Sequence, residues 1–180
     1  MINNINGAGP LSKKTGVIFL LLTMLFFNGC GVYSFTGASI DSNVKTVRIP
    51  TFGNQASLVI PALSQKLTLQ LKTKFTTGTS LAFTDNPAEA DLEFNGNITG
   101  YTVTPQAAQA GETAALTRIT VTVSVDFKNN KNPKQNWSNS FSFYQDFDSN
   151  KDISTVLDGL LDTICEQLAD DIFNKAVVNW

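Results

Sequence analysis

Two stretches in the second half of the chain alternate between apolar and polar residues. In residues 119–127, Ile, Val and Phe occupy the odd positions, whereas Thr, Ser and Asp occupy the even positions. In residues 137–147, aromatic residues recur at odd positions, and serines fill most of the even positions. An alternation with period two places the apolar side chains on one face of a β-strand. Because the polar connection 129–134 is short, the two stretches are predicted to pair as a long antiparallel hairpin.

The aromatic residues of the second stretch are interpreted as part of the hydrophobic core, because a domain of this size needs large side chains inside. They are Trp137, Phe141, Phe143 and Phe147. A lipid-binding groove is the alternative, and it is favoured only if no helix covers their face of the sheet.

Two other segments repeat their apolar residues every three or four positions, which is the spacing of one helical face. The first covers residues 57–75, with Ser57 as the expected N-cap and Pro61 in the first turn, where a missing amide hydrogen costs little. The second begins at Asp152 and runs to Ile172. Each of these helices has an apolar stripe that must be buried against another layer.

Three further strands are predicted at residues 44–50, 81–84 and 90–104. The third changes its alternation around Gly96 and Gly100, which indicates a bulge or a sharp bend. The element order is therefore β, α, β, β, β, β, α. This order predicts an α+β fold, a two-layer sandwich in which a mostly antiparallel sheet of four to five strands packs against two helices.

The N-terminus has the layout of a secretion signal. Lys13 and Lys14 precede an apolar run at residues 17–27, interrupted by a single threonine. A membrane-spanning helix needs about 20 apolar residues, so this run is too short to be a typical span. Residues 1–29 are predicted to be a signal peptide that is removed.

Cys30 directly follows Gly29 at the end of this run, where a lipoprotein signal places the cysteine that receives lipid. Acyl chains each contribute about 0.8 kcal/mol of membrane affinity per buried methylene, so two or three of them hold a protein on a bilayer. Cys30 is therefore predicted to be the lipidated first residue of a single domain covering residues 30–180. The alternative is an ordinary secretory or membrane-anchoring signal.

The composition makes several classes of function unfavourable. Without the predicted signal, the chain has 11 basic and 15 acidic residues, a balance that argues against nucleic-acid binding. Histidine is absent, and neither a metal-ligand spacing nor a catalytic motif occurs. Cys165 lies beside the apolar stripe of the last helix and is interpreted as a small core residue. The sequence predicts no enzyme, no cofactor and no metal site.

Three lysines surround the connection of the predicted hairpin in a chain that is otherwise acidic. They are Lys128, Lys131 and Lys134, here called the lysine tip. Clustered cations attract phosphate groups, which makes the lysine tip the candidate ligand-binding site. A solvated turn without a ligand is the alternative.

With this order of elements behind a lipidated cysteine, four segments together resemble the LptE family of lipopolysaccharide-assembly lipoproteins. The segments are Cys-Gly-Val-Tyr-Ser-Phe at 30–35, Val-Lys-Thr-Val-Arg-Ile-Pro at 44–50 followed by Phe52, Asn-Pro-Ala-Glu-Ala-Asp-Leu at 86–92 and Gly-Asn-Ile-Thr-Gly-Tyr at 96–101. The resemblance extends through Tyr144 and the last helix. Of the family's functional residues, only the lipidated cysteine maps onto this chain, at Cys30.

The resemblance implies a lipid-anchored, palmitate-bearing protein on the periplasmic side of the outer membrane. It implies that the protein sits inside the β-barrel LptD, plugs it, assists its assembly and helps insert lipopolysaccharide at the cell surface. An auxiliary lipoprotein of an ABC-type lipid transporter is an alternative, which co-purification with a large barrel distinguishes. A ligand-binding surface lipoprotein is another, which protease treatment of whole cells distinguishes.

Overall fold

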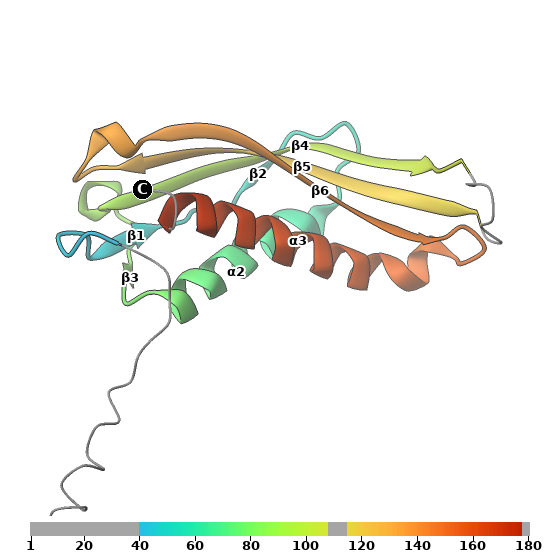
Figure 1. Ribbon diagram of the computed structural model, residues 1–180, viewed down its shortest axis with the longest axis horizontal. Coiled ribbons are helices and arrows are strands. Elements are labelled where there is room, and N and C mark those ends of the chain that lie inside the picture. The colour runs from blue at the N-terminus through green and yellow to red at the C-terminus, as the bar shows by residue number, and fades with distance from the viewer. Residues whose placement is uncertain (1–39, 108–114, 178–180) are drawn as a thin grey trace, which may run out of the picture. The chain divides into compact units, whose positions relative to one another are not determined.

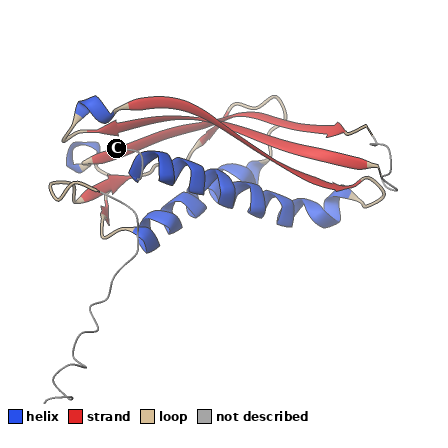
Figure 2. Ribbon diagram, in the orientation of Figure 1, coloured by secondary structure: helices blue, strands red, loops and turns tan. Residues whose placement is uncertain are grey.

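The computed structural model describes residues 40–107 and 115–177, and they form a sheet with two helices on one of its faces (Figures 1 and 2). All of these residues belong to one compact unit, Thr36–Trp180. The predicted signal peptide and Cys30 lie outside the described residues. The predicted α+β sandwich is confirmed.

The sheet is mixed and has the strand order β3-β1-β4-β5-β6, with β2 also paired to β4. Strands β4, β5 and β6 are long and antiparallel, whereas the three short strands run parallel to their neighbours. The strand bounds are Thr46–Arg48 (β1), Gly53–Asn54 (β2), Ala82–Phe83 (β3), Leu92–Pro105 (β4), Leu116–Asn129 (β5) and Trp137–Asp148 (β6). The sequence pattern missed the two-residue β2 and did not indicate the parallel pairings. The parallel pair β1 and β3 follows from the helix between them, because a helical crossover returns the chain to the same end of the sheet.

The first long helix, α2, covers Pro61–Gly78 and begins later than predicted. Its N-cap is Ile60, which makes no side-chain capping bond, so the prediction of Ser57 as the cap is wrong. The reason lies in Pro61, which disfavours helical angles in the residue before it and itself fits the first helical position. Ile60 accordingly has extended backbone angles, φ −101° and ψ 110°.

The second long helix, α3, covers Ile153–Val177 and starts where the sequence predicts. The backbone amide of Ser154 donates to Asp152 Oδ1 at 2.9 Å, and this bond satisfies one of the free amides of the first turn. Two short 3₁₀ turns, Pro87–Glu89 and Pro133–Gln135, lie in the connections before β4 and β6.

The hydrophobic core lies between the sheet and the two helices. The odd-numbered residues of β5 from Ile119 to Phe127 are buried, as the alternation predicts. The ring of Phe94 on β4 contacts those of Phe75 on α2 and Phe127, with centroids 5.1 and 4.9 Å apart. Burial raises the pKa of the Cys165 thiol to about 12, so the thiol stays protonated at neutral pH.

Four aromatic residues of β6 are partly buried against this core, namely Trp137, Phe141, Phe143 and Phe147, and α3 packs beneath the strand. The structure thus favours the core interpretation of these residues over a lipid groove.

The predicted bulge is present in β4. The pairing of β4 with β5 shifts between Ile98 and Gly100, which leaves Thr99 without a pairing partner. At Gly96, the Phe52 ring packs so closely on the strand that an added Cβ would collide with it. Glycine at this position therefore allows the loop before α2 to contact the sheet.

Candidate functional site

One face of the sheet is free of helices, and we call it the open face. Both long helices lie on the opposite side of the sheet, as Figures 1 and 2 show. The register of β4, β5 and β6 aligns small polar side chains across the open face. Its central residues are Asn95, Asn97, Thr102, Thr104, Thr120, Thr122, Ser124, Ser138, Ser140, Ser142 and Tyr144.

Most of these groups are available for an external partner. Thr122 Oγ1 and Ser142 Oγ lie 3.0 Å apart and form a hydrogen bond across β5 and β6. For the side chains of Ser124, Ser138 and Ser140, by contrast, the described part of the chain provides no hydrogen bond. A hydroxyl group can both donate and accept, so these residues can match many polar surfaces.

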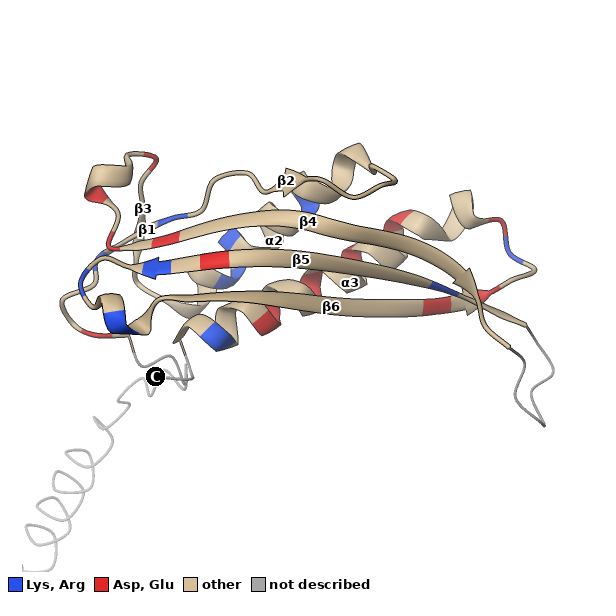
Figure 3. Ribbon diagram, turned by 90° about the horizontal axis from the view of Figure 1, so that it is seen from above, with Lys and Arg blue, Asp and Glu red and all other residues tan. Residues whose placement is uncertain are grey.

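The centre of the open face carries no charge. Residues 94–104, 119–125 and 137–145 contain no Asp, Glu, Lys or Arg. Figure 3 shows charged residues on these strands only toward their ends. The open face is therefore a neutral, hydrogen-bonding surface with charges at its two ends.

At one end of the open face, Arg118 is held by its neighbours on β6. Its guanidinium donates to both carboxylate oxygens of Asp146, at 2.7 and 2.8 Å, and lies 3.6 Å from the ring centroid of Tyr144. The hydrogen bonds to Arg118 lower the pKa of Asp146, and those to Asp146 raise the pKa of Arg118. The charge of Arg118 is therefore neutralised by Asp146 at this end of the sheet.

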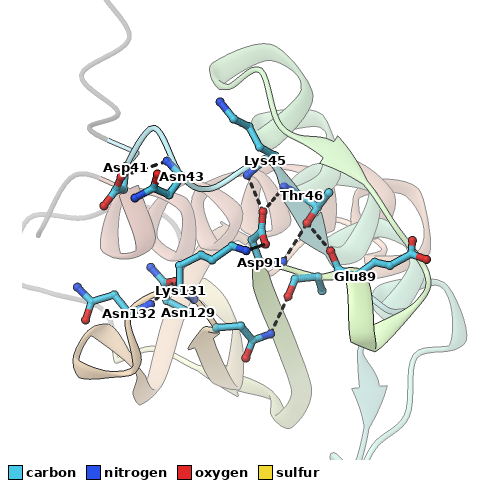
Figure 4. Close-up of polar contacts among 11 residues, drawn as sticks. Asp41, Asn43, Lys45, Thr46, Glu89, Asp91, Asn129, Lys131 and Asn132 are labelled. Carbon is cyan, nitrogen blue, oxygen red and sulfur yellow. Dashed lines mark hydrogen bonds and ion pairs between the residues drawn. The ribbon is translucent and has the colours of Figure 1, made fainter.

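At the other end lies the lysine tip, and the structure separates its three members. Lys131 Nζ lies 3.1 Å from Asp91 Oδ1 and forms an ion pair with it, as Figure 4 shows. Lys128 and Lys134 are exposed and form no ion pair within the described ranges. Of the three lysines of the tip, Lys128 and Lys134 are therefore the ones that can bind an external anion without breaking an ion pair within the described ranges.

Asp91 connects three parts of the chain at this end. Its Oδ2 accepts the backbone amides of Lys45 at 2.7 Å and Thr46 at 3.1 Å, while its Oδ1 binds Lys131. Burial by itself raises the pKa of Asp91, but the Lys45 amide, Lys131 and the Thr46 amide together lower it below its ordinary value. No local sequence pattern indicates this contact, because Asp91 is one of several acidic residues in a turn.

Lys128 lies beside a shallow depression of about 340 Å³ next to the open face. The lining residues are Asn95, Asp126, Phe127, Lys128, Asn136 and Trp137. The lining thus combines polar and charged residues with two aromatic residues. Lys151 lies in the turn after β6, at the end of this strand opposite the lysine tip.

On the side of the sheet that carries the helices, lysines of α2 form ion pairs with acidic residues of α3. Lys66 of α2 pairs with Asp158 and Asp162 of α3, at 2.9 and 2.5 Å. Lys74 pairs with Asp170 at 2.7 Å and lies 3.6 Å from Glu166. The acidic residues of α3 therefore connect the two helices.

Neither a metal site nor a membrane-spanning helix occurs within residues 40–107 and 115–177. No cluster of three or more Cys, Asp or Glu side chains there is able to hold a metal ion. Neither long helix combines the length and hydrophobicity needed to cross a bilayer.

A family model described as LptE, lipopolysaccharide-assembly, matches residues 44–176 of the chain. No curated protein matches the chain at a significant level. Among solved structures, a minor lipoprotein from Acinetobacter baumannii has 13% identity and a TM-score of 0.50, covering 76% of this chain and 95% of its own. This similarity shows a shared fold.

Two further structures are similar at a lower level. A putative neuraminyllactose-binding hemagglutinin homolog from Helicobacter pylori has 12% identity and a TM-score of 0.48, with 79% of this chain and 88% of its own covered. The hypothetical protein CT253 from Chlamydia trachomatis has 8% identity and a TM-score of 0.48, with 74% of this chain and 98% of its own covered.

Proposed function

This chain belongs to the LptE family of lipopolysaccharide-assembly proteins, a family of accessory lipoproteins rather than enzymes, and we propose that it plugs an LptD-type outer-membrane barrel. In this proposal Cys30 carries the lipid anchor on the periplasmic side of the outer membrane. The domain then occupies the barrel lumen, assists barrel assembly and helps insert lipopolysaccharide at the cell surface.

The observation that supports this role is the open face. The interior of an outer-membrane barrel is polar, so a domain inside it needs a polar surface that exchanges hydrogen bonds with the wall. A charge buried there without a partner costs several kcal/mol, whereas hydroxyl and amide groups reorient to find a partner. Strands of 12 to 14 residues extend over about 40 Å or more, enough to contact the wall along its height.

The lysine tip supports a contact with the phosphates of lipopolysaccharide. Lys128 and Lys134 are exposed at the same end of the β5–β6 hairpin, next to the depression that Lys128 lines. Both are available to an anion, since neither has an internal ion pair within the described ranges. Such a contact depends on salt, because exposed charges are screened over about 8 to 10 Å at physiological ionic strength.

Co-purification with the barrel tests the plug role. Ser124→Arg places a charge at the centre of the open face, and Gln65→Arg places the same charge on an exposed position of α2. We expect the LptD-type barrel to be recovered from detergent-solubilised outer membrane with the wild type and Gln65→Arg, and to be lost with Ser124→Arg. Recovery with both variants would refute a role for the open face. An ABC-type transporter as the recovered partner would favour the alternative function.

A binding assay tests the lysine tip separately. The double variant Lys128→Gln, Lys134→Gln removes the two lysines of the tip that form no ion pair in the described ranges, and Lys151→Gln removes an exposed cation at the other end of β6. We expect only the double variant to weaken binding of purified lipopolysaccharide, with a smaller difference at high salt. Equal binding by all three proteins would exclude the lysine tip and leave the plug role standing.

A further inference from the structure

Strand β6 forms one edge of the sheet over its whole length. It pairs with β5 from Trp137 to Asp148, and no other described strand lies on its outer side. The opposite edge of the sheet ends in β3, which has two residues. A free edge exposes a row of unpaired backbone N–H and C=O groups. In the described part of the chain, β6 is therefore a long and uninterrupted template for another strand.

The hydrogen bonds at the end of the hairpin identify which residues carry the free groups. Ser149 N donates to Ala115 O at 2.9 Å, directly beyond the last registered pair of β5 and β6. Hydrogen-bonded and non-hydrogen-bonded pairs alternate in an antiparallel ladder. Odd residues of β6 therefore bond to β5, and even residues direct their N–H and C=O outward. On the other side of β5, Gln106 N donates to Leu116 O at 2.8 Å, which agrees with this alternation.

The residues with free backbone groups are the same ones whose side chains lie on the open face. They are Ser138, Ser140, Ser142, Tyr144 and Asp146. A strand that pairs with β6 therefore continues the open face, with the partly buried rings of Phe141 and Phe143 on its other side.

Strand β6 lacks the features that usually protect an edge. Residues 137–145 contain no proline, glycine or charge, and their register with β5 has no bulge. The second half of β4 also has no partner on its outer side among the described strands, but it has the bulge at Thr99, then Gly100 and Pro105. These features interrupt pairing there. The two free edges are thus different, and β6 is the one suited to pairing.

We propose that β6 pairs along its free edge with an extended strand of the barrel protein that contacts the open face, an interaction that rests on the proposed function. The continuity of edge and open face supports this partner, because a protein that covers one reaches the other. The pairing strand of the barrel protein is expected to have hydroxyl or amide side chains on the side of the open face and apolar side chains on the side of the helices. It is also expected to have no charge along its centre. Strand addition of this kind combines backbone hydrogen bonds for affinity with side-chain matching for specificity.

Residue-resolved amide hydrogen exchange tests the pairing on the full mature protein, alone and in complex with the purified barrel. In the protein alone, the even amides of β6 are expected to exchange rapidly and the odd amides slowly. In the complex, the amides of Ser138, Ser140, Ser142 and Tyr144 are expected to slow about tenfold or more, because they become part of a ladder.

Substitution at Ser140 provides an independent measurement. Ser140→Pro removes an outward N–H without removing a bond to β5, and Ser140→Ala leaves the N–H in place. We expect the proline variant to bind the barrel at least about tenfold more weakly than the wild type. A tenfold loss of affinity corresponds to the loss of about one hydrogen bond. The alanine variant loses only the hydroxyl group and keeps the N–H, so it is expected to bind the barrel more tightly than the proline variant. A proline variant that folds and binds normally would overturn the proposal.

The outcomes separate this inference from the proposed function. A complex in which the even amides still exchange rapidly would overturn strand pairing and leave the plug role standing. If no complex forms, both fail. Slow even amides in the protein alone, or a dimeric mass in solution, would show that the chain itself or a second copy occupies the edge, and this would also overturn the proposal.

Discussion

Asp91 is expected to stabilise the domain by connecting β1 to the β5–β6 hairpin, and Asp91→Asn tests this. The carboxylate accepts two backbone amides and pairs with Lys131, although only 13% of the Asp91 side chain is exposed. Asparagine keeps the shape and one acceptor oxygen but removes the charge. Hydrogen bonds to a charged group contribute about 1.5–3 kcal/mol each, against about 0.5–1.5 kcal/mol for neutral pairs.

The ion pair itself adds little, because Lys131 is half exposed and such pairs contribute about 0.2–1 kcal/mol. The expected loss for Asp91→Asn is therefore about 1–3 kcal/mol in the free energy of unfolding at pH 7. Urea denaturation of the domain without its lipid measures this loss. Asp85→Asn is the matched control, because Asp85 is exposed in the same region and its carboxylate has no described partner. It is expected to change the stability by less than about 0.5 kcal/mol.

The pH dependence gives a second check on the same contact. The folded-state pKa of Asp91 lies below its ordinary value, so the stabilisation is fully present above the unfolded pKa of about 3.9. It is lost as the pH falls through the folded pKa. The difference between wild type and Asp91→Asn should therefore shrink below about pH 4. A difference that stays constant between pH 7 and pH 3, or a loss no larger than that of Asp85→Asn, would refute the reasoning.

Three further predictions concern the core, the bulged strand and the anchor. Val123→Asp buries a charge at a fully buried position and should cost at least about 3 kcal/mol in thermal or urea unfolding, whereas Ser124→Asp on the open face should cost far less. Gly96→Ala should destabilise by about 1–3 kcal/mol because its Cβ meets the Phe52 ring, whereas Gly159→Ala, with open space around it in α3, should stabilise by about 0.5–1 kcal/mol. Mass spectrometry of the mature protein should find acyl chains on Cys30 at the new N-terminus, and an unmodified terminus or cleavage elsewhere would contradict the lipoprotein prediction.

The sequence by itself determined the elements whose patterns are local. The alternation over residues 119–127 and 137–147 predicted the antiparallel hairpin of β5 and β6, because each residue's exposure depends mainly on which face of its strand it occupies. The three-and-four spacing predicted both long helices for the same reason. The change of alternation around Gly96 and Gly100 predicted the bulge in β4, which lies between Ile98 and Gly100. The start of α2 was misplaced although its signal was also local, namely the extended backbone that Pro61 imposes on Ile60.

Only the tertiary structure decided which surfaces and charges remain free. The three lysines of the tip look equivalent in sequence, yet Lys131 is paired with Asp91, 40 residues away along the chain, while Lys128 and Lys134 have no such partner in the described ranges. Each strand's alternation predicts one polar face, but it does not show that both helices lie on the other side and leave the open face uncovered. Short strands such as β2 have too few residues for any pattern, and they form because β4 provides the hydrogen-bonding partner. The physical reason is that a hydrophobic pattern records the environment of each residue, whereas the identity of its neighbour depends on how distant segments pack together.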